Sequence, residues 1–485
     1  MLLVVILLPM IAGLFVPLIK WKKRWQMELF IEAFVIINSI LVWYIILGPD
    51  HSPHTVVNFT GGLAITFCAD GLGMIFAGLV SSLWPLATLY AFEYMTKEEH
   101  ERAFFMFYTM TYGVTLGIAL ADNILTMYFF YELLTIVTVP LVMHTLSRKA
   151  ILAGRKYMYY SLGGAAFAFI GMIFVIMYGV TPEFTLGGVL DMARVGDKTN
   201  VLLLIYVLAF FGFGVKAAVW PFNSWLPDAG VAPTPVTALL HAVAVVKSGA
   251  FAIFRLTYYC FGADFLRGTW AQYVTMAATM FTIVYGCSRA VKETHLKRRL
   301  AYSTISNLSY ILFGVTMMSP LGMVAGLSHM IMHAVMKICS FFCAGAIMHE
   351  AEREYINEMD GLGYCMPQVY GIFAVSGLAL MGVPGLAGFV SKWNLASAAV
   401  ESGMPLAYAG IVCLLVSAIL TAIYMMSFVI RGFFPVKEFD HSVNKGITDP
   451  NWKMLLPLYV FVAFMFYFGL HSTPVMELLC SVAGL

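Results

Sequence analysis

Charged side chains are scarce in this 485-residue sequence. Aspartate, glutamate, lysine and arginine together make up 11% of it, whereas hydrophobic residues make up 61%. The mean hydropathy of +0.85 leaves too few polar residues to cover the surface of a water-soluble protein. This scarcity excludes a soluble domain. We therefore expect an integral membrane protein that contacts the lipid bilayer and has no nucleic-acid partner.

Cysteine is present but never in a metal-binding arrangement. The eight cysteines are scattered singly through apolar segments, and the nearest pair, Cys339 and Cys343, is spaced one helical turn apart. The sequence contains no CxxC motif and no Cys/His group with the spacing of a metal site. We therefore expect no iron–sulfur or zinc site and no cofactor in this chain.

Apolar runs follow one another along nearly the whole chain. A helix needs about 20 apolar residues to cross about 30 Å of hydrocarbon, and the runs between charged, Gly and Pro interruptions predict fourteen spans. The predicted spans are 1–19, 27–47, 72–94, 104–121, 123–144, 157–179, 201–222, 236–261, 270–290, 300–318, 323–347, 366–400, 405–430 and 454–471. The first run lacks a basic segment before it and a cleavage site after it, which favours a span over a signal peptide.

The distribution of lysine and arginine predicts the orientation of these spans. Most of the 28 basic residues fall into the loops of one side, Lys437 among them, whereas the other side holds only Arg194, Lys198 and Arg267. The positive-inside rule assigns the basic side to the cytoplasm. Both termini are therefore expected outside.

Five basic residues fall within the predicted spans: Lys216, Lys247, Arg255, Lys337 and Lys392. A cation at the middle of the bilayer costs about 2.5 to 3.5 kcal/mol on insertion scales. Arg255 lies near the outer end of its span, so its side chain could reach the interface by snorkelling. The four lysines lie too deep for that. Intramembrane lysines either form structural ion pairs or mark pathways for ions and substrates.

Histidines accompany these lysines. His329, His333 and Lys337 are spaced at i, i+4 and i+8, which places them on one face of a helix, and His241 stands near the start of another span. Two other interpretations are haem ligation by these histidines and packed, hydrogen-bonded histidines without chemistry. A haem site does not require four intramembrane lysines. Because His329 and His333 share one helix face with Lys337, an ion pathway is favoured.

Glu132 is the only carboxylate in the middle of a predicted span. An isolated buried glutamate stays protonated, whereas one near a lysine can be charged. We therefore expect Glu132 to approach Lys216 closely enough for an ion pair or a water bridge.

Proline interrupts two of the spans beside a lysine. Pro221 and Pro227 follow Lys216, and Pro384 precedes Lys392 in a glycine-rich stretch. Irregular backbone at membrane depth is tolerated only where it is buried in protein or lines a wet cavity. Two broken spans in the two halves of a chain are typical of inverted-repeat transporters. We therefore predict broken helices in spans seven and twelve.

The spans then group into four parts. Residues 1–100 contain the first three spans, 101–262 the first repeat of five helices, 263–432 the second repeat, and 433–485 a loop and the last span. The predicted fold class is an all-α polytopic membrane protein with about fourteen transmembrane helices and two inverted five-helix repeats.

Four long segments carry a family resemblance. They are GVKAAVWPFNSWLPDAGVAPTPVTALLHAVAVVKSGAF (214–251), RLAYSTISNLSYILFG (299–314), HMIMHAVMKICSFFCAGAIMHE (329–350) and GVPGLAGFVSKW (382–393). Together they resemble the antiporter-like proton-pumping subunits of respiratory complex I, and the related subunits of formate hydrogenlyases, membrane-bound hydrogenases and multisubunit Na+/H+ antiporters. The resemblance covers most of the chain. This family has fourteen core helices and both termini outside, in agreement with the spans and orientation inferred above.

The resemblance implies that a row of intramembrane residues moves protons. The glutamate of the fifth helix matches Glu132, its partner lysine matches Lys216, and the terminal position on the second broken helix matches Lys392. Some relatives have a glutamate at that last position, so a lysine fits only certain subfamilies. The absence of a long lateral helix after the last span favours a subunit of the middle type. The candidate residues for proton translocation are Glu132, Lys216, His241, Lys247, His329, His333, Lys337 and Lys392.

The function implied by the resemblance is ion translocation, with protons as the expected ion, in a complex I-like respiratory complex in the cell membrane of a prokaryote. No redox group and no catalytic residue can be placed in this chain. Peripheral redox subunits with iron–sulfur clusters are therefore expected as partners, beside other membrane subunits that include further antiporter-like ones. The enzyme would then be the whole complex, of NADH-quinone oxidoreductase or hydrogenase type. A subunit of a multisubunit Na+/H+ antiporter is the alternative, because those subunits share the motifs.

Overall fold

Long helices make up most of this computed structural model, which describes residues 1–435 and 440–485. Ten helical stretches of the described residues are long and apolar enough to cross a membrane, as judged by length and composition. They are Arg24–Leu47 (α2), Gly71–Lys97 (α3 and η2), Ile124–Val142 (α5), Arg148–Tyr178 (α6), Met192–Gly214 (α7, η3 and α8), Thr234–Phe261 (α10, α11 and η5), Trp270–Lys292 (α13), Pro320–Ala351 (α15), Pro405–Phe433 (α19) and Trp452–Leu470 (α20). The protein is therefore a multi-pass membrane protein.

Further helices complete the bundle. They are α1 (Leu2–Leu18), α4 (Glu101–Ala119), α9 (Trp225–Asp228), α12 (Ala263–Leu266), α14 (Leu296–Thr316), α16 (Leu362–Cys365), α17 (Pro367–Met381), α18 (Ala387–Glu401) and α21 (Thr473–Ala483). The prediction of a polytopic helical membrane protein is confirmed, whereas the exact count of fourteen spans and the two inverted repeats stay predictions. Lys437, which the sequence assigns to the basic side, lies outside the described residues.

Several helices begin at a side chain that accepts a hydrogen bond from the first turn. Asp70 accepts from the backbone of α3 at 3.0 Å, Asn123 from that of α5 at 2.8 Å, and Ser319 from that of α15 at 3.1 Å. Such caps satisfy backbone N–H groups that have no partner inside the helix. Polar residues between the apolar runs thus set where these helices start.

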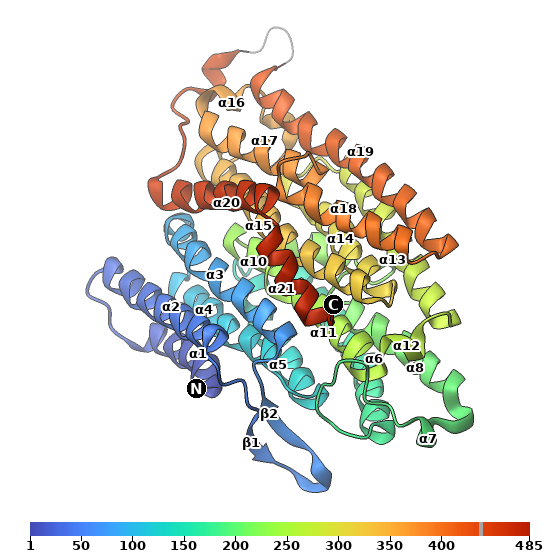
Figure 1. Cartoon of the computed structure of the whole chain (residues 1–485). Helices are drawn as coiled ribbons and strands as arrows, with labels where there is room; N and C mark the ends of the chain where they lie inside the picture. Colours follow the sequence, from blue (N-terminus) through green and yellow to red (C-terminus); the bar gives the residue numbers. More distant parts are fainter. Residues whose placement is uncertain (436–439) are drawn as a thin grey trace.

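Helix α15 lies at the centre of the fold. Figure 1 shows α1 and α2 (blue) on one side of the bundle and α17 and α19 (orange) on the other, with α15, α20 and α21 between them. α15 packs against α10 and α14 from the middle of the chain and against α17, α18 and α20 from its later part. In the most apolar window of α15, 94% of the residues are buried inside the protein, compared with 28% for α19. Polar side chains on α15 are therefore surrounded by protein.

The two predicted breaks are present. Helix α8 (Thr199–Gly214) ends just before Lys216, and turns follow it up to α9. Helix α17 ends at Met381 and α18 begins at Ala387, so the second break lies between them. The prediction of broken helices at spans seven and twelve is confirmed.

A third break was not predicted from the sequence. Helix α10 (Thr234–Ala242) ends directly after His241, and α11 (Val245–Phe254) begins two residues before Lys247. The segment Arg255–Phe261 continues as a π-helix, η5. No proline or glycine marks the interruption at 243–244, which is why the sequence pattern indicates a continuous span.

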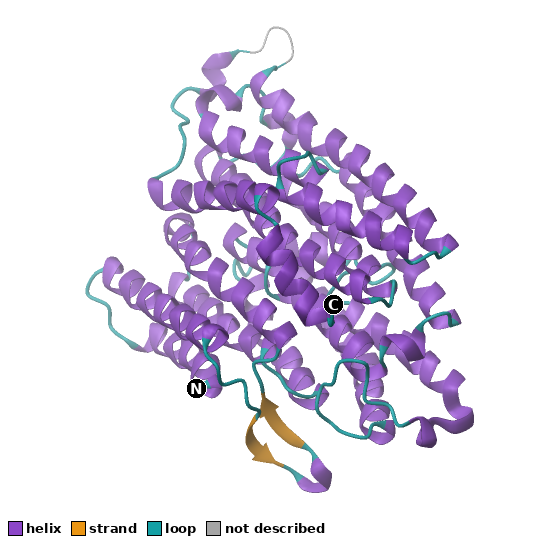
Figure 2. Ribbon diagram, in the orientation of Figure 1, coloured by secondary structure: helices purple, strands orange, loops and turns teal. Residues whose placement is uncertain are grey.

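The two ends of the bundle differ. At one end, the basic end, ion pairs tie the connecting segments to the helix ends, such as Arg24 to Glu101 at 2.5 Å and Arg431 to Asp360 at 2.7 Å. The other end carries an antiparallel hairpin of β1 (His54–Asn58) and β2 (Ala64–Phe67), drawn in orange in Figure 2. Neither this hairpin nor α21 is predicted from the sequence, because both are too short for a search based on membrane spans.

Candidate functional site

The lysines and histidines predicted from the sequence lie buried among the central helices. The following six have no exposed surface: Lys216, His241, Lys247, His329, His333 and Lys337. They come from the turn after α8, from α10 and α11, and from α15. Lys392 on α18 and Glu132 on α5 are partly exposed.

Lys216 is held by the backbone and ring of one tyrosine. Its ammonium group donates a hydrogen bond to the backbone carbonyl of Tyr131 and lies 3.4 Å from the centroid of the Tyr131 ring. A carbonyl dipole and an aromatic face stabilise a cation without adding a negative charge. Helix α11 packs closely against this turn, since a Cβ at Gly249 would lie 2.6 Å from the Ala217 nitrogen. Glycine at position 249 thus brings Lys216 next to the helix that carries Lys247.

Glu132 follows Tyr131 on α5, but it does not form a direct ion pair with Lys216 in the described part of the chain. The two charges are close enough to interact electrostatically. The carboxylate oxygen Oε1 of Glu132 is buried and has no hydrogen-bond partner among the residues that the structure describes. A small movement of this side chain would therefore change the electrostatic surroundings of Lys216.

The centre of the row is a lysine–histidine contact. The Lys247 Nζ lies 2.6 Å from the Nδ1 of His333. The His333 ring stacks on that of His329 with centroids 5.7 Å apart. On its other side, His329 contacts the Ser391 hydroxyl of α18 through Nδ1 at 2.9 Å. The predicted stripe on α15 thus connects α11 with the helix that carries Lys392.

Tyr310 lies between His329 and Lys392. Its ring centroid is 5.1 Å from that of His329 and 5.2 Å from the Lys392 Nζ. The Lys392 ammonium donates to the backbone carbonyls of Leu380 at 2.7 Å and Met381 at 3.1 Å. These carbonyls belong to the last turn of α17, where no following helical N–H group donates a hydrogen bond to them. The helix break therefore supplies the acceptors for the lysine.

Lys337 turns away from the histidines toward hydroxyl groups. Its Nζ donates to the Ser303 Oγ of α14 at 2.7 Å, and Ser303 contacts the Tyr424 hydroxyl of α19 at 2.7 Å. Tyr424 in turn lies 3.1 Å from the Thr421 hydroxyl. Sequence reasoning missed Ser303, Tyr310 and Tyr424, because hydroxyl-bearing residues are common in membrane helices and carry no distinctive spacing.

Among the three candidate histidines, His241 has the fewest hydrogen-bond partners. Neither of its ring nitrogens has a hydrogen-bond partner among the described residues, and its ring packs edge-on against Phe341 at 5.1 Å. Buried polar atoms in native proteins are nearly always paired with protein or ordered water. His241 therefore keeps the capacity to accept or donate a hydrogen bond. The Nε2 atoms of His329 and His333 share this property.

Arg255 does not snorkel, and the interpretation from the sequence is wrong. Its side chain is buried and forms two hydrogen bonds with the Asp70 carboxylate, at 2.6 and 2.5 Å. The guanidinium also lies 4.6 Å from the Phe184 ring and 4.8 Å from the Tyr259 ring. Asp70 caps α3 near the β1–β2 hairpin, a position that the sequence does not connect with Arg255.

The sequence pattern did not single out a second carboxylate that lies within a membrane-spanning helix besides Glu132. Glu32 lies on α2, and its Oε2 is buried without a hydrogen-bond partner. Glu28, one turn earlier, is paired with Arg24 at 2.9 Å and with Lys453 at 3.0 Å. Because these residues stand close to the start of the apolar run, the sequence pattern indicates an interfacial position. Within the described residues, no group of three His, Cys, Asp or Glu side chains is arranged to hold a metal ion.

Two curated relatives match nearly the whole chain. NAD(P)H-quinone oxidoreductase chain 4-3 of Nostoc sp. is 27% identical over 469 residues, which cover 91% of this chain and 80% of that protein. The Na(+)/H(+) antiporter subunit A1 of Staphylococcus aureus is 27% identical over 494 aligned positions, covering 96% of this chain. This chain spans 60% of the length of the staphylococcal protein.

Two solved structures share the fold. The archaeal membrane-bound sulfane sulfur reductase contains a chain that matches with a TM-score of 0.83 and 22% identity, covering 99% of this chain and 96% of that one. The Mrp complex of Dietzia sp. contains another, with a TM-score of 0.83 and 21% identity, covering 100% of this chain and 97% of that one. Both belong to multisubunit membrane complexes.

The strongest assignment comes from a family profile. The transmembrane profile of the NADH:quinone oxidoreductase/Mrp antiporter family matches residues 121–421. This segment is more than half of the chain and includes every candidate residue from Glu132 to Lys392. The chain therefore belongs to the NADH:quinone oxidoreductase/Mrp antiporter family.

Proposed function

We propose that this chain is an ion-translocating membrane subunit of a complex I-like, redox-driven respiratory complex and that it moves protons along its row of buried side chains. One observation carries this proposal: buried Lys216, Lys247 and Lys337 and partly exposed Lys392 contact carbonyl, ring, imidazole or hydroxyl groups instead of carboxylates. Burial disfavours the charged form of a lysine, and no directly bound anion offsets this. The charged and neutral forms of these side chains are then close in free energy, as a proton carrier requires.

We propose that Glu132 regulates the protonation of the first lysine in this row, Lys216. When its carboxylate moves toward Lys216, the charged lysine is stabilised, and when it moves away, the proton is released. Lys247, His333, His329 and Lys337 pass the proton across the centre to Lys392. His241 joins the row from the end of α10. The break at Pro384 keeps Lys392 beside free backbone carbonyls, and the break at Pro221 and Pro227 places Lys216 in a turn beside α5.

The proposed setting is the cell membrane of a prokaryote. The basic end faces the cytoplasm and both termini lie outside, because the positive-inside rule favours this orientation. Other membrane subunits, among them further antiporter-like ones, are the proposed neighbours, together with peripheral redox subunits that carry iron–sulfur clusters. The relative named as a quinone oxidoreductase chain supports this setting. Moving one charge across the membrane costs about 2.3 kcal/mol per 100 mV, an amount that redox partners can supply.

A subunit of a multisubunit Na+/H+ antiporter is the second candidate. The similarity to the antiporter subunit A1 of S. aureus and to the Mrp complex of Dietzia sp. favours it. The same buried row would then couple proton movement to sodium movement in a complex without redox partners.

The test is transport by inverted membrane vesicles that carry the whole complex. Replacing Lys216 or Lys392 by alanine should abolish formation of the pH gradient while assembly and electron transfer by the partners partly persist, because only the proton carrier is removed. Lys22→Ala, an exposed loop substitution at the basic end, is the control and should pump normally.

Two outcomes would change the assignment. Normal pumping by a fully assembled Lys392→Ala variant would overturn the relay. A pH gradient that forms only when sodium is present would move the protein to the antiporter alternative.

A further inference from the structure

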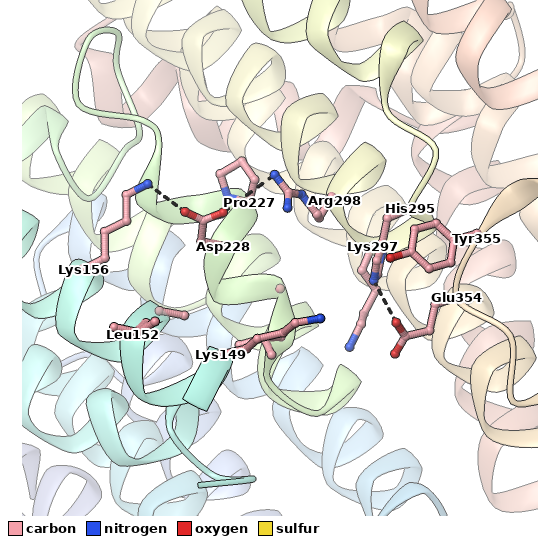
Figure 3. Close-up of a pocket in the computed structure, with 13 residues that line it drawn as sticks. Lys149, Leu152, Lys156, Pro227, Asp228, His295, Lys297, Arg298, Glu354 and Tyr355 are labelled. Atoms are coloured by element: carbon pink, nitrogen blue, oxygen red, sulfur yellow. Dashed lines mark hydrogen bonds and ion pairs between the residues drawn. The ribbon is translucent and has the colours of Figure 1, made fainter. Parts of the chain in front are cut away.

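A cavity of about 460 Å³ opens at the basic end of the bundle. Its walls come from α6, from α9 and the following 3-10 turn η4 (Ala229–Val231), from the start of α14, and from the loop at 352–355. Six of its thirteen lining residues carry a charged side chain, and Figure 3 shows Lys149 and Lys297 extending into the space between these elements. These charged groups can bind water and small ions.

Most charges around this cavity are neutralised by a direct partner. Lys156 pairs with Asp228 at 2.7 Å, and His295 lies 3.4 Å from Glu354. Lys297 differs, because it takes part in no ion pair within the described residues. Its side chain is only 6% exposed, and its Nζ donates to the backbone carbonyl of Ala232 at 2.9 Å.

Lys297 therefore has the same chemistry as the lysines of the central row. Lys216 is likewise buried and bound by a backbone carbonyl, and Lys392 is likewise bound by backbone carbonyls. Two carboxylates act on Lys297 from a distance, Glu98 and Glu354. Burial raises the pKa of Glu98, whereas the hydrogen bond from His295 lowers that of Glu354. Lys297 thus interacts electrostatically with two carboxylates, of which Glu354 lines the cavity, and forms a direct ion pair with neither of them.

A short polar path leads from Lys297 to the central row. The Ala232 carbonyl that accepts from Lys297 also accepts from the Thr237 hydroxyl at 3.0 Å. His241 follows Thr237 by one turn of α10, about 6 Å away along the helix. Both ring nitrogens of His241 are buried and unpartnered, and the charges that act on it are those of Lys337 and Lys297.

We propose that this cavity is the cytoplasmic entrance for protons, with Lys297 as the first buried carrier and His241 as its link to Lys337. The proposal rests on the function proposed above and adds one residue, Lys297, and a route to it. In each passage Lys297 loses one proton toward His241 and regains one from water in the cavity. No other group changes its charge overall.

The test uses two replacements of Lys297 in the intact complex. Arginine keeps the charge and the hydrogen bond to Ala232 but does not release a proton, whereas glutamine removes the charge. If Lys297 carries protons, both variants should pump about tenfold or more slowly than the wild type, with electron transfer and assembly retained. If its role is only structural, arginine should restore pumping. Lys156→Gln, which changes a paired charge in the same cavity, should reduce pumping far less.

Measuring Lys216→Ala in the same vesicles separates the two proposals. Collapse of pumping in Lys216→Ala with normal pumping in Lys297→Arg would overturn the entrance and leave the proposed function standing. Normal pumping in both would overturn the proposed function itself. His241→Phe supplies a second variant, since it keeps the edge-on ring contact with Phe341 but has no nitrogen, and it should be as slow as Lys297→Arg.

Discussion

Buried cations in this protein bind two different kinds of partner. Arg255 is bound by the Asp70 carboxylate and surrounded by aromatic rings, whereas Lys216 and Lys392 contact only carbonyls and rings. A guanidinium does not lose its proton in proteins, so a fixed ion pair suits it. An ammonium group held by neutral acceptors can lose its proton. The choice of partner thus separates structural cations from the proposed carriers.

The Arg255–Asp70 pair should contribute to stability. Replacing Arg255 by methionine leaves the Asp70 carboxylate without its partner and should cost about 3 kcal/mol, at the low end of the range for buried pairs because Asp70 stays partly exposed. Thermal unfolding of the purified protein in detergent measures this loss. The double variant Arg255→Met/Asp70→Asn should recover part of it. A double variant as unstable as the single one would contradict the ion-pair explanation.

Asp122 should make the stability depend on pH. It lies in the α4–α5 connection, where burial, together with Asp70 and Glu183, raises its pKa to about 6. Because the folded-state pKa lies above the unfolded value of about 3.9, the folded protein binds this proton more tightly. Stability from this group is therefore full below about pH 4 and is lost as the pH rises toward 6.

Asp122→Asn removes that dependence. The variant should melt at a higher temperature than the wild type above pH 6, and the difference should vanish at pH 4. Melting curves between pH 4 and 8 provide the measurement. Asp197→Asn, at an exposed position of η3, is the control and should follow the wild type throughout. A difference between Asp122→Asn and the wild type that is constant with pH would rule out titration of Asp122.

At the scale of elements, the breaks in the helices place the lysines. The first turn of α18 lies directly against the last turn of α17, since a Cβ at Gly388 would overlap the Ala379 carbonyl. This close approach keeps Lys392 within hydrogen-bond distance of the Leu380 and Met381 carbonyls. The geometry of the break therefore determines the surroundings of the terminal lysine.

Gly388→Ala should disturb this contact. Overpacking of this kind costs about 1 to 3 kcal/mol, and the shift of α18 should also slow pumping because Lys392 moves away from its carbonyls. Thermal unfolding and vesicle transport measure the two effects. Gly371→Ala on α17 is the matched control, since a Cβ there meets nothing within 4 Å, and it should keep or slightly raise stability. Equal behaviour of the two variants would contradict the proposed role of the break.

At the scale of the whole molecule, the two broken regions flank the central helix α15. One lysine follows α8 and the other lies on α18, and the stacked histidines of α15 lie between them. We propose that residues 101–262 and 263–432 form the two inverted repeats, preceded by the first three spans at 1–100 and followed by the last at 433–485. Such a symmetry would explain why the break beside Lys216 has a counterpart beside Lys392 and why each half contributes two lysines to the row.

The sequence by itself determined the membrane class, the positions of two breaks, and the buried lysines and histidines. These features are predictable because their physical causes are local: hydrocarbon requires long apolar runs, and a charge or proline inside such a run stands out. The third break, at 243–244, was not predictable, since no proline or glycine marks it. The short hairpin was missed because its strands are not membrane spans.

Only the tertiary structure decided what each buried group contacts. Arg255 and Asp70 are 185 positions apart, and Lys247 and His333 are 86 apart. Carbonyls and hydroxyls occur throughout every helix, so nothing in the sequence distinguishes Leu380 or Ser303 as a lysine partner. The Lys297 cavity likewise exists only because α6, α9 and α14 converge at the basic end. Contacts between distant segments depend on the packing of the whole bundle, which local patterns do not encode.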